Sequence, residues 1–210
     1  MDPYQTAVEV AREAGALLLA RVGRPLETAE KGQRADLVTA ADRESEALIV
    51  ARLRAATPHA AILGEEGGTR AGSADERWIV DPLDGTTNYA HGYPLYCVSI
   101  AYERAGDVQA GVVFAPALGE LFAARRGGGA TCNGEPLAVS RVASLGEAMV
   151  CTGFKPAHFA RNGRFFARLS ELAQAVRRDG AAALDLAFVA CGRFDAFWEF
   201  DLSPWDVAAG

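Results

Sequence analysis

Asp81 and Asp84 stand three residues apart, directly after an apolar run and directly before a glycine and two threonines. Carboxylates at the end of a buried strand are held rigidly, and oxygen ligands at this density suit Mg²⁺ or Mn²⁺ better than Zn²⁺. Pro82 fixes the turn between the two aspartates, and Gly85 permits a positive φ or the start of a helix. Thr86 is then placed to cap a helix whose first N–H groups face an anion. The segment therefore predicts a site for cations and a phosphate.

Each candidate residue also has a purely structural interpretation. Asp-Pro and Asp-Gly are ordinary turn dipeptides, although the full run over residues 78–88 is far more specific than either. Thr39 and Asp42 have the spacing of a capping box, so Asp42 is open to a structural role, a catalytic role or both. Glu65, in a Glu-Glu pair flanked by glycines, is compatible with a solvated loop, and Asp206 with a helix N-cap.

The bulk composition limits the classes of function. The chain has 210 residues, 50% of them hydrophobic and 23% charged, which predicts an ordered core rather than disorder. The formal net charge of -6 argues against nucleic-acid binding through a basic face. An acidic protein that acts on an anion needs local positive charge, which bound divalent cations supply.

The same composition bears on location. No apolar run approaches the roughly 20 residues of a membrane helix, and the N-terminus has no basic segment of a signal peptide. The four cysteines form no CxxC pair. We therefore expect a cytoplasmic protein with free, mostly buried thiols and no membrane partner.

Two groups of elements must position the candidate residues. Apolar periodicity predicts a helix over residues 3–22 and a second from Thr39 to the residue before Pro58. An antiparallel sheet is predicted from β-like runs at residues 61–63, 78–80, 97–102, 108–114 and 121–124. A parallel sheet is predicted from the later alternation of strand 149–151, helices 158–176 and 182–190, and strand 194–198. We expect one unit over residues 1–140 and a smaller α/β unit over residues 141–210.

Five separated motifs resemble those of the inositol monophosphatase family, in that family's order. The run over residues 78–88 resembles its metal-binding signature. The other motifs are Lys31 with residues 36–42, residues 64–66, residues 180–186, and Glu199 with Trp205-Asp206. The resemblance covers nearly the whole chain. It implies a layered αβαβα sandwich and a Mg²⁺-dependent, lithium-sensitive phosphatase that forms a homodimer.

The resemblance also implies a role for particular residues. Glu65, Asp81 and the carbonyl of Leu83 would hold a first Mg²⁺. Asp81, Asp84 and Asp206 would hold a second, and a third, weaker ion would share Glu65, with Mn²⁺ as a possible replacement. Asp42 and Thr86, together with Glu65, would form the catalytic group that orients or deprotonates the attacking water. Two cations roughly 3.5–4 Å apart activate water and offset the repulsion between nucleophile and phosphate dianion.

Substrate selection follows from a second set of residues. By the resemblance, the phosphate would rest on Gly85 and Thr86, Glu199 would bind substrate hydroxyls, and Ala182 would contact the ring. Ala181 replaces the Ser or Thr that is common at this position in the family. This set favours myo-inositol 1-phosphate or a similar polyol phosphate. The alternatives are histidinol phosphate, fructose 1,6-bisphosphate and 3′-phosphoadenosine nucleotides, because relatives that act on them share most of the motifs.

The end of the chain favours a different class of function. Members of the family usually continue for about fifty residues beyond the Trp-Asp motif, and a segment next to a chain end frays. Asp206 is therefore expected to be weakly held, which favours a catalytically impaired binding or regulatory homologue. Some relatives bind transcription machinery. The complete set of acidic residues around Thr86 favours an enzyme instead.

Overall fold

The computed structural model describes residues 2–23, 28–30, 37–155 and 158–210. Lys31 and Asp36, which belong to the first motif, lie outside these residues. Within the described parts of the chain, no helix combines the length and the apolar character needed to cross a membrane.

Two long helices begin at the residues that the sequence indicates. Helix α1 (Pro3–Arg21) starts after Asp2, whose side chain accepts a hydrogen bond from the Tyr4 N–H at 3.0 Å. Helix α2 (Ala40–Ala56) starts after Thr39, which forms a complete capping box with Asp42. The predicted helices over residues 3–22 and from Thr39 are confirmed.

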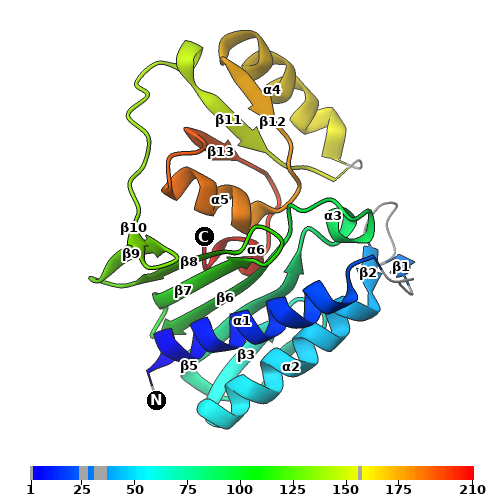
Figure 1. Cartoon of the computed structure of the whole chain (residues 1–210), viewed down its shortest axis with the longest axis vertical. Helices are drawn as coiled ribbons and strands as arrows, with labels where there is room; N and C mark the ends of the chain where they lie inside the picture. Colours follow the sequence, from blue (N-terminus) through cyan, green and yellow to red (C-terminus); the bar gives the residue numbers. More distant parts are fainter. Residues whose placement is uncertain (1, 24–27, 31–36, 156–157) are drawn as a thin grey trace.

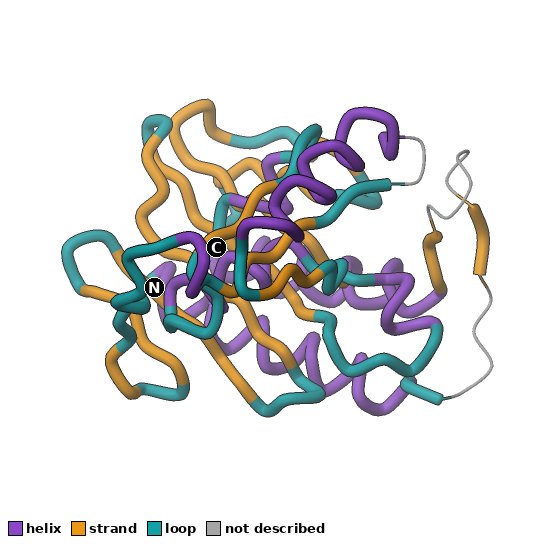
Figure 2. The backbone as a smooth tube through the Cα atoms, turned by 90° about the horizontal axis from the view of Figure 1, so that it is seen from above, coloured by secondary structure: helices purple, strands orange, loops and turns teal. Residues whose placement is uncertain are grey.

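The described strands form one large sheet, one small sheet and a hairpin. The large sheet has eight strands in the order β10-β9-β8-β7-β6-β5-β3-β4, and the hairpin pairs β1 with β2. Their bounds are β1 (Thr28–Glu30), β2 (Leu37–Thr39), β3 (Ala60–Gly64), β4 (Gly68–Arg70), β5 (Ser73–Asp84), β6 (Cys97–Arg104), β7 (Asp107–Ala115), β8 (Glu120–Arg125), β9 (Gly129–Cys132) and β10 (Glu135–Pro136). Seen from above, the strands twist relative to one another, as in other open sheets (Figure 2).

The expected all-antiparallel pairing is wrong at one place in the large sheet. Strand β4 takes the edge position beside β3, so β5 pairs on the other side of β3 and runs parallel to it. The carboxyl ends of β3 and β5 therefore meet at one edge. Short strands such as β4 and β9 carry too few apolar residues for the sequence to indicate them.

The C-terminal part forms a three-stranded sheet in the order β12-β11-β13. Strand β11 (Met149–Thr152) pairs in parallel with both β12 (Ala175–Arg177) and β13 (Ala196–Trp198), so the predicted parallel sheet is confirmed. The predicted helix over residues 158–176 is too long. Helix α4 (Phe159–Leu172) ends at Leu172, because the backbone of the next residue, Ala173, is extended. Residues 175–177 then pair with β11 instead of continuing the helix. Here tertiary pairing outweighs local helical pattern.

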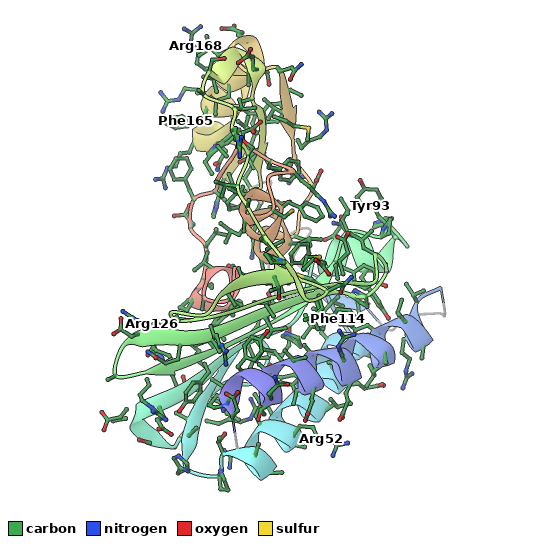
Figure 3. All side chains as sticks on the ribbon, turned by 60° about the vertical axis from the view of Figure 1, so that its left-hand side comes forward. Arg52, Tyr93, Phe114, Arg126, Phe165 and Arg168 are labelled. Carbon is green, nitrogen blue, oxygen red and sulfur yellow. The ribbon has the colours of Figure 1, made fainter. Side chains whose placement is uncertain are left out.

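The elements stack in five layers, which confirms the predicted αβαβα sandwich (Figure 1). Helices α1 and α2 cover one face of the large sheet. Helix α5 (Ala182–Ala190) and the short α6 (Pro204–Val207) lie on its other face, between the two sheets. Helix α4 packs against β12 on the outside, and Figure 3 shows Phe165 and Arg168 on this helix at the far end of the molecule.

Two hydrophobic cores hold the layers together. One lies between α1, α2 and the large sheet, and Gly15 permits its close packing, because a Cβ there would meet the Phe114 ring at 2.4 Å. Figure 3 shows Phe114 where the sheet meets α1. The other core joins the opposite face of the sheet to α5 through residues such as Val113 and Phe188. The division into units at residue 140 stays a prediction.

Candidate active site

A bulge at the end of β5 turns Asp81 and Asp84 toward the same face of the sheet. Residues three apart on a regular strand point to opposite faces. Here Asp81 pairs with Ser99 and Asp84 with Cys97, so three steps on β5 match two on β6. Pro82 lies inside the bulge, where its missing N–H breaks no ladder bond, and its carbonyl accepts a hydrogen bond from Ser45 Oγ at 2.9 Å.

Gly85 makes the turn that follows possible. Its φ is 88°, and a Cβ there would lie 2.9 Å from the Leu95 carbonyl oxygen. Only glycine adopts this conformation without strain. Gly85 is itself the N-cap of the short helix α3 (Thr86–Ala90) and provides no side-chain cap. The expectation that a threonine caps this helix is therefore wrong, since Thr86 is the first helical residue.

Thr86 instead bonds to the second element of the site. Its Oγ1 lies 2.9 Å from Asp42 Oδ1 and 3.1 Å from the Leu83 carbonyl oxygen. Asp42 is fully buried, and its other oxygen accepts hydrogen bonds from Thr39 N at 2.8 Å and Thr39 Oγ1 at 2.6 Å. One carboxylate thus caps α2 and holds the Thr86 hydroxyl, so the capping interpretation of Asp42 is confirmed. Its catalytic role stays a prediction.

Glu65 reaches the site because β3 and β5 end at the same edge. Its N–H donates to the Val80 carbonyl at 3.2 Å. The loop after it is held by Glu46 of α2, which is buried and accepts hydrogen bonds from the N–H groups of Glu66 at 2.8 Å and Gly67 at 3.1 Å. Glu46 also binds Arg70 at 2.8 Å. Sequence reasoning missed this positioning residue, because its partners lie some 20 residues further along the chain.

Asp206 lies on the first turn of α6, on the face of the large sheet opposite to α1 and α2. Its carboxylate accepts a hydrogen bond from Ser203 N at 2.6 Å in a capping-box arrangement. The Trp205 carbonyl accepts a further bond from Ser99 Oγ of β6 at 3.1 Å. Asp206 is the third helical residue rather than an N-cap. These contacts restrain its turn, and the expectation that it is weakly held stays a prediction.

Burial and neighbouring carboxylates raise the pKa values of Asp81 and Asp84. The pKa of Asp81 lies well above its usual value, first because of burial and then because of Glu65, Asp84 and Asp206. Burial and the neighbouring Asp206 raise the pKa of Asp84 to about 8, although the Ala183 N–H, 2.7 Å from its Oδ2, acts in the opposite direction. The carboxylates thus repel one another, and a cation among them would relieve this repulsion. The donor set of this cluster, carboxylates with a backbone carbonyl nearby, fits hard divalent cations.

A cleft of about 380 Å³ opens beside these carboxylates. Its lining includes all four residues predicted to contact substrate, namely Gly85, Thr86, Ala182 and Glu199. The Glu199 carboxyl has its pKa raised to about 7, first by burial and then by Asp206, while Arg178 and Lys155 lower it. Sequence reasoning gave Arg178 no role. It is placed at the cleft by stacking 4.7 Å from the Phe154 ring and donating to the Phe154 carbonyl.

The fold is a layered α/β protein in which carboxylates that follow β3 and lie on β5 and α6 come close together, a donor set that suits a divalent cation. The match to known proteins is more specific. The model of the inositol monophosphatase family matches residues 2–210, and the chain belongs to that family.

Individual relatives carry several names. An inositol-1-monophosphatase from Synechocystis is 45% identical over 98% of this chain and 75% of its own length. A Nus factor SuhB from Pseudomonas aeruginosa is 46% identical over 97% of this chain and 79% of its own. The crystal structure of the suhB protein from Bartonella henselae superposes with a TM-score of 0.94 at 41% identity, covering 98% of this chain and 81% of that one.

Proposed function

We propose that the chain is a Mg²⁺-dependent phosphomonoesterase that hydrolyses myo-inositol 1-phosphate or a similar polyol phosphate. The observation that carries this proposal is a cleft lined by Asp84, Asp206 and Thr86, with buried Asp81 close behind the two aspartates. The Thr86 hydroxyl is bonded to Asp42. Similarity to phosphatases of the family supports the reaction class. The substrate and the ion are our inference from the site.

The acidic residues would hold the ions. Glu65, Asp81 and the Leu83 carbonyl provide a first set of oxygen ligands, and Asp84 and Asp206 complete a second set that shares Asp81. A third, weaker ion would share Glu65. Bound cations supply the positive charge that offsets the phosphate dianion and lowers the pKa of water. Two divalent cations would also balance the charge of the four carboxylates of this site. They would thereby relieve the mutual repulsion that contributes to the raised pKa values of Asp81 and Asp84.

Thr86 and Asp42 would handle the proton. The Thr86 hydroxyl donates to Asp42, so the lone pairs on Oγ1 are directed to accept a hydrogen bond from a water in the cleft. Asp42 holds this orientation because its own position is set by Thr39 and the start of α2. The attacking water is thereby oriented, and the proton it loses passes toward the Asp42 carboxylate.

The rest of the cleft would bind the substrate. The phosphate rests at the Gly85 turn, which lines the cleft together with Thr86. Glu199 accepts hydrogen bonds from vicinal hydroxyls, and Ala182 contacts the ring. Gly153 lets the chain approach Glu199 closely, because a Cβ there would meet Glu199 Oε2 at 2.1 Å.

Phosphate release from a panel of substrates tests this proposal. The panel contains myo-inositol 1-phosphate, histidinol phosphate, fructose 1,6-bisphosphate and a 3′-phosphoadenosine nucleotide, each with Mg²⁺ and with chelator. Asp84→Asn is expected to abolish turnover. Asp75→Asn, which changes an exposed aspartate on the same strand, is the matched control and retains it. If no substrate shows Mg²⁺-dependent turnover, the proposal that the chain is a phosphatase is refuted. If turnover is best on a substrate other than myo-inositol 1-phosphate, only the proposed substrate is wrong.

A second candidate function is a regulatory binding protein. It is favoured by relatives named Nus factor SuhB, one of them 46% identical to this chain. The panel separates the two, because a regulator without catalysis gives no turnover. For the enzyme we further expect inhibition by Li⁺, a cytoplasmic location and a homodimer. Light scattering of the purified chain checks the last of these.

A further inference from the structure

A second group of potential metal ligands lies outside the residues assigned above. Cys151 on β11, Asp179 after β12 and Asp185 on α5 place their sulfur and carboxylate oxygens within 4.8 Å of one another. Among the described residues, these three are the group of Cys, His, Asp or Glu side chains whose ligand atoms lie close enough together to share one ion. Asp185 lies within the motif of residues 180–186, Cys151 and Asp179 lie outside all five motifs, and none of the three was predicted to hold magnesium.

Asp185 is the residue that the fold leaves unexplained. Its side chain is 1% exposed, and neither carboxylate oxygen has a hydrogen-bond partner among the described residues. A buried carboxylate without donors is costly, and native proteins normally pair such a group. Burial and the acidic residues Asp179, Asp84 and Glu199 raise the pKa of Asp185 to about 8, and only the neighbouring Cys151 thiol acts in the opposite direction. A divalent cation bound here would take the place of the Asp185 proton and offset the negative charge of these neighbours.

The chemistry of the group indicates what would fill it. One sulfur and two carboxylates suit a thiophilic divalent ion such as Zn²⁺, whereas Mg²⁺ prefers six oxygens in an octahedron. Zinc ligands lie about 2.0–2.3 Å from the ion, so the three ligand atoms must draw together by about 1 Å. Half-buried Asp179 has the freedom to do so. Asp179 also lines the cleft, so an ion can reach the group from solvent and a water can serve as the fourth ligand.

We propose that Cys151, Asp179 and Asp185 form a site for one thiophilic divalent cation, separate from the proposed magnesium site. Binding releases the thiol proton of Cys151, and the proton of Asp185 where it is present, to solvent. The site is linked to the active site on two sides. Asn88 of α3 donates to the Asp179 carbonyl at 2.7 Å, and α5 contacts Asp84 through the Ala183 N–H.

Cobalt is the probe that reports this site directly. The chain is freed of metal with a chelator, kept reduced without added thiol, and titrated with Co²⁺ in excess Mg²⁺. We expect a near-ultraviolet thiolate-to-cobalt absorption that saturates at one Co²⁺ per chain and disappears when Zn²⁺ is added. This readout does not depend on phosphatase activity, so it stands apart from the proposed function.

Variants locate the ion. Cys151→Ser is expected to remove the absorption, and Asp179→Asn to weaken Co²⁺ binding about tenfold or more. Cys191→Ser is the matched control and keeps it. If Cys151→Ser does not fold by circular dichroism, Asp179→Asn decides alone, because its side chain lies at the cleft. No thiolate absorption at saturating Co²⁺ overturns the proposal. So does an absorption that survives in both variants or is lost only in Cys97→Ser, whose sulfur lies beside Asp84.

Discussion

Replacing Thr86 with valine removes one hydroxyl and keeps the shape of the side chain. That hydroxyl lies 2.9 Å from a buried oxygen of Asp42, and a hydrogen bond to a charged group contributes about 1.5–3 kcal/mol. Asp42 keeps both bonds from Thr39, so we expect the free energy of unfolding to fall by only about 1–2 kcal/mol. Turnover should fall far more, by about 100- to 10,000-fold, as for loss of a group that transfers a proton.

Two measurements on the same protein separate these effects. Urea unfolding gives the loss of stability, and initial rates at saturating Mg²⁺ give kcat and KM for the best substrate of the panel. Thr86→Ser keeps the hydroxyl and should retain turnover within about tenfold of the parent. The reasoning fails if Thr86→Val retains turnover within about threefold, or if Thr86→Ser loses as much as Thr86→Val.

Three further changes test the surrounding structure. Thr39→Ala removes the cap of α2 and should lower the free energy of unfolding by about 1–2 kcal/mol in urea, whereas Thr39→Ser should not. Trp78→Phe removes the 2.7 Å bond from Nε1 to Thr57 Oγ1 and should cost about 1–3 kcal/mol in the same assay. Asp84 binds its proton more tightly when folded, with a pKa of about 8 against its ordinary value of 3.8, so with chelator present stability should fall as pH rises through this window. Asp84→Asn should flatten that fall in thermal unfolding between pH 5 and pH 9, and an unchanged slope would contradict the assignment.

Much of the site could be predicted because its residues are contiguous. The run from Asp81 to Thr86 combines a strand, a proline and a glycine, and each of these restricts the backbone in a way that the residue type reveals. The structure confirms the turn that Pro82 and Gly85 predict. It adds a feature that the sequence did not indicate, which is the bulge that brings two aspartates at odd spacing to one face of the sheet.

Other features depend on contacts between distant segments. Glu46 holds the Glu65 loop through backbone N–H groups, and a backbone group carries no mark in the sequence. Residues 175–177 continue a helical pattern, but parallel pairing with β11 makes them a strand. The Asp185 cluster likewise joins three elements whose residues show no common motif. Periodicity and short motifs report local preference, and these features are decided by packing.

The two aspartates at the edges of the proposed site are held by the same device. Asp42 accepts a hydrogen bond from the N-cap residue Thr39, and Asp206 from the N-cap residue Ser203. A capping box fixes the side chain of its third residue against the first turn of the helix. For Asp42 this occupies one oxygen and leaves the other to Thr86. The helix starts thus restrict both carboxylates, which for Asp206 would reduce the ordering that the proposed cation must impose on binding. The capping role of Asp42 is therefore compatible with the catalytic role that we propose for it, because the oxygen that faces Thr86 takes no part in the cap.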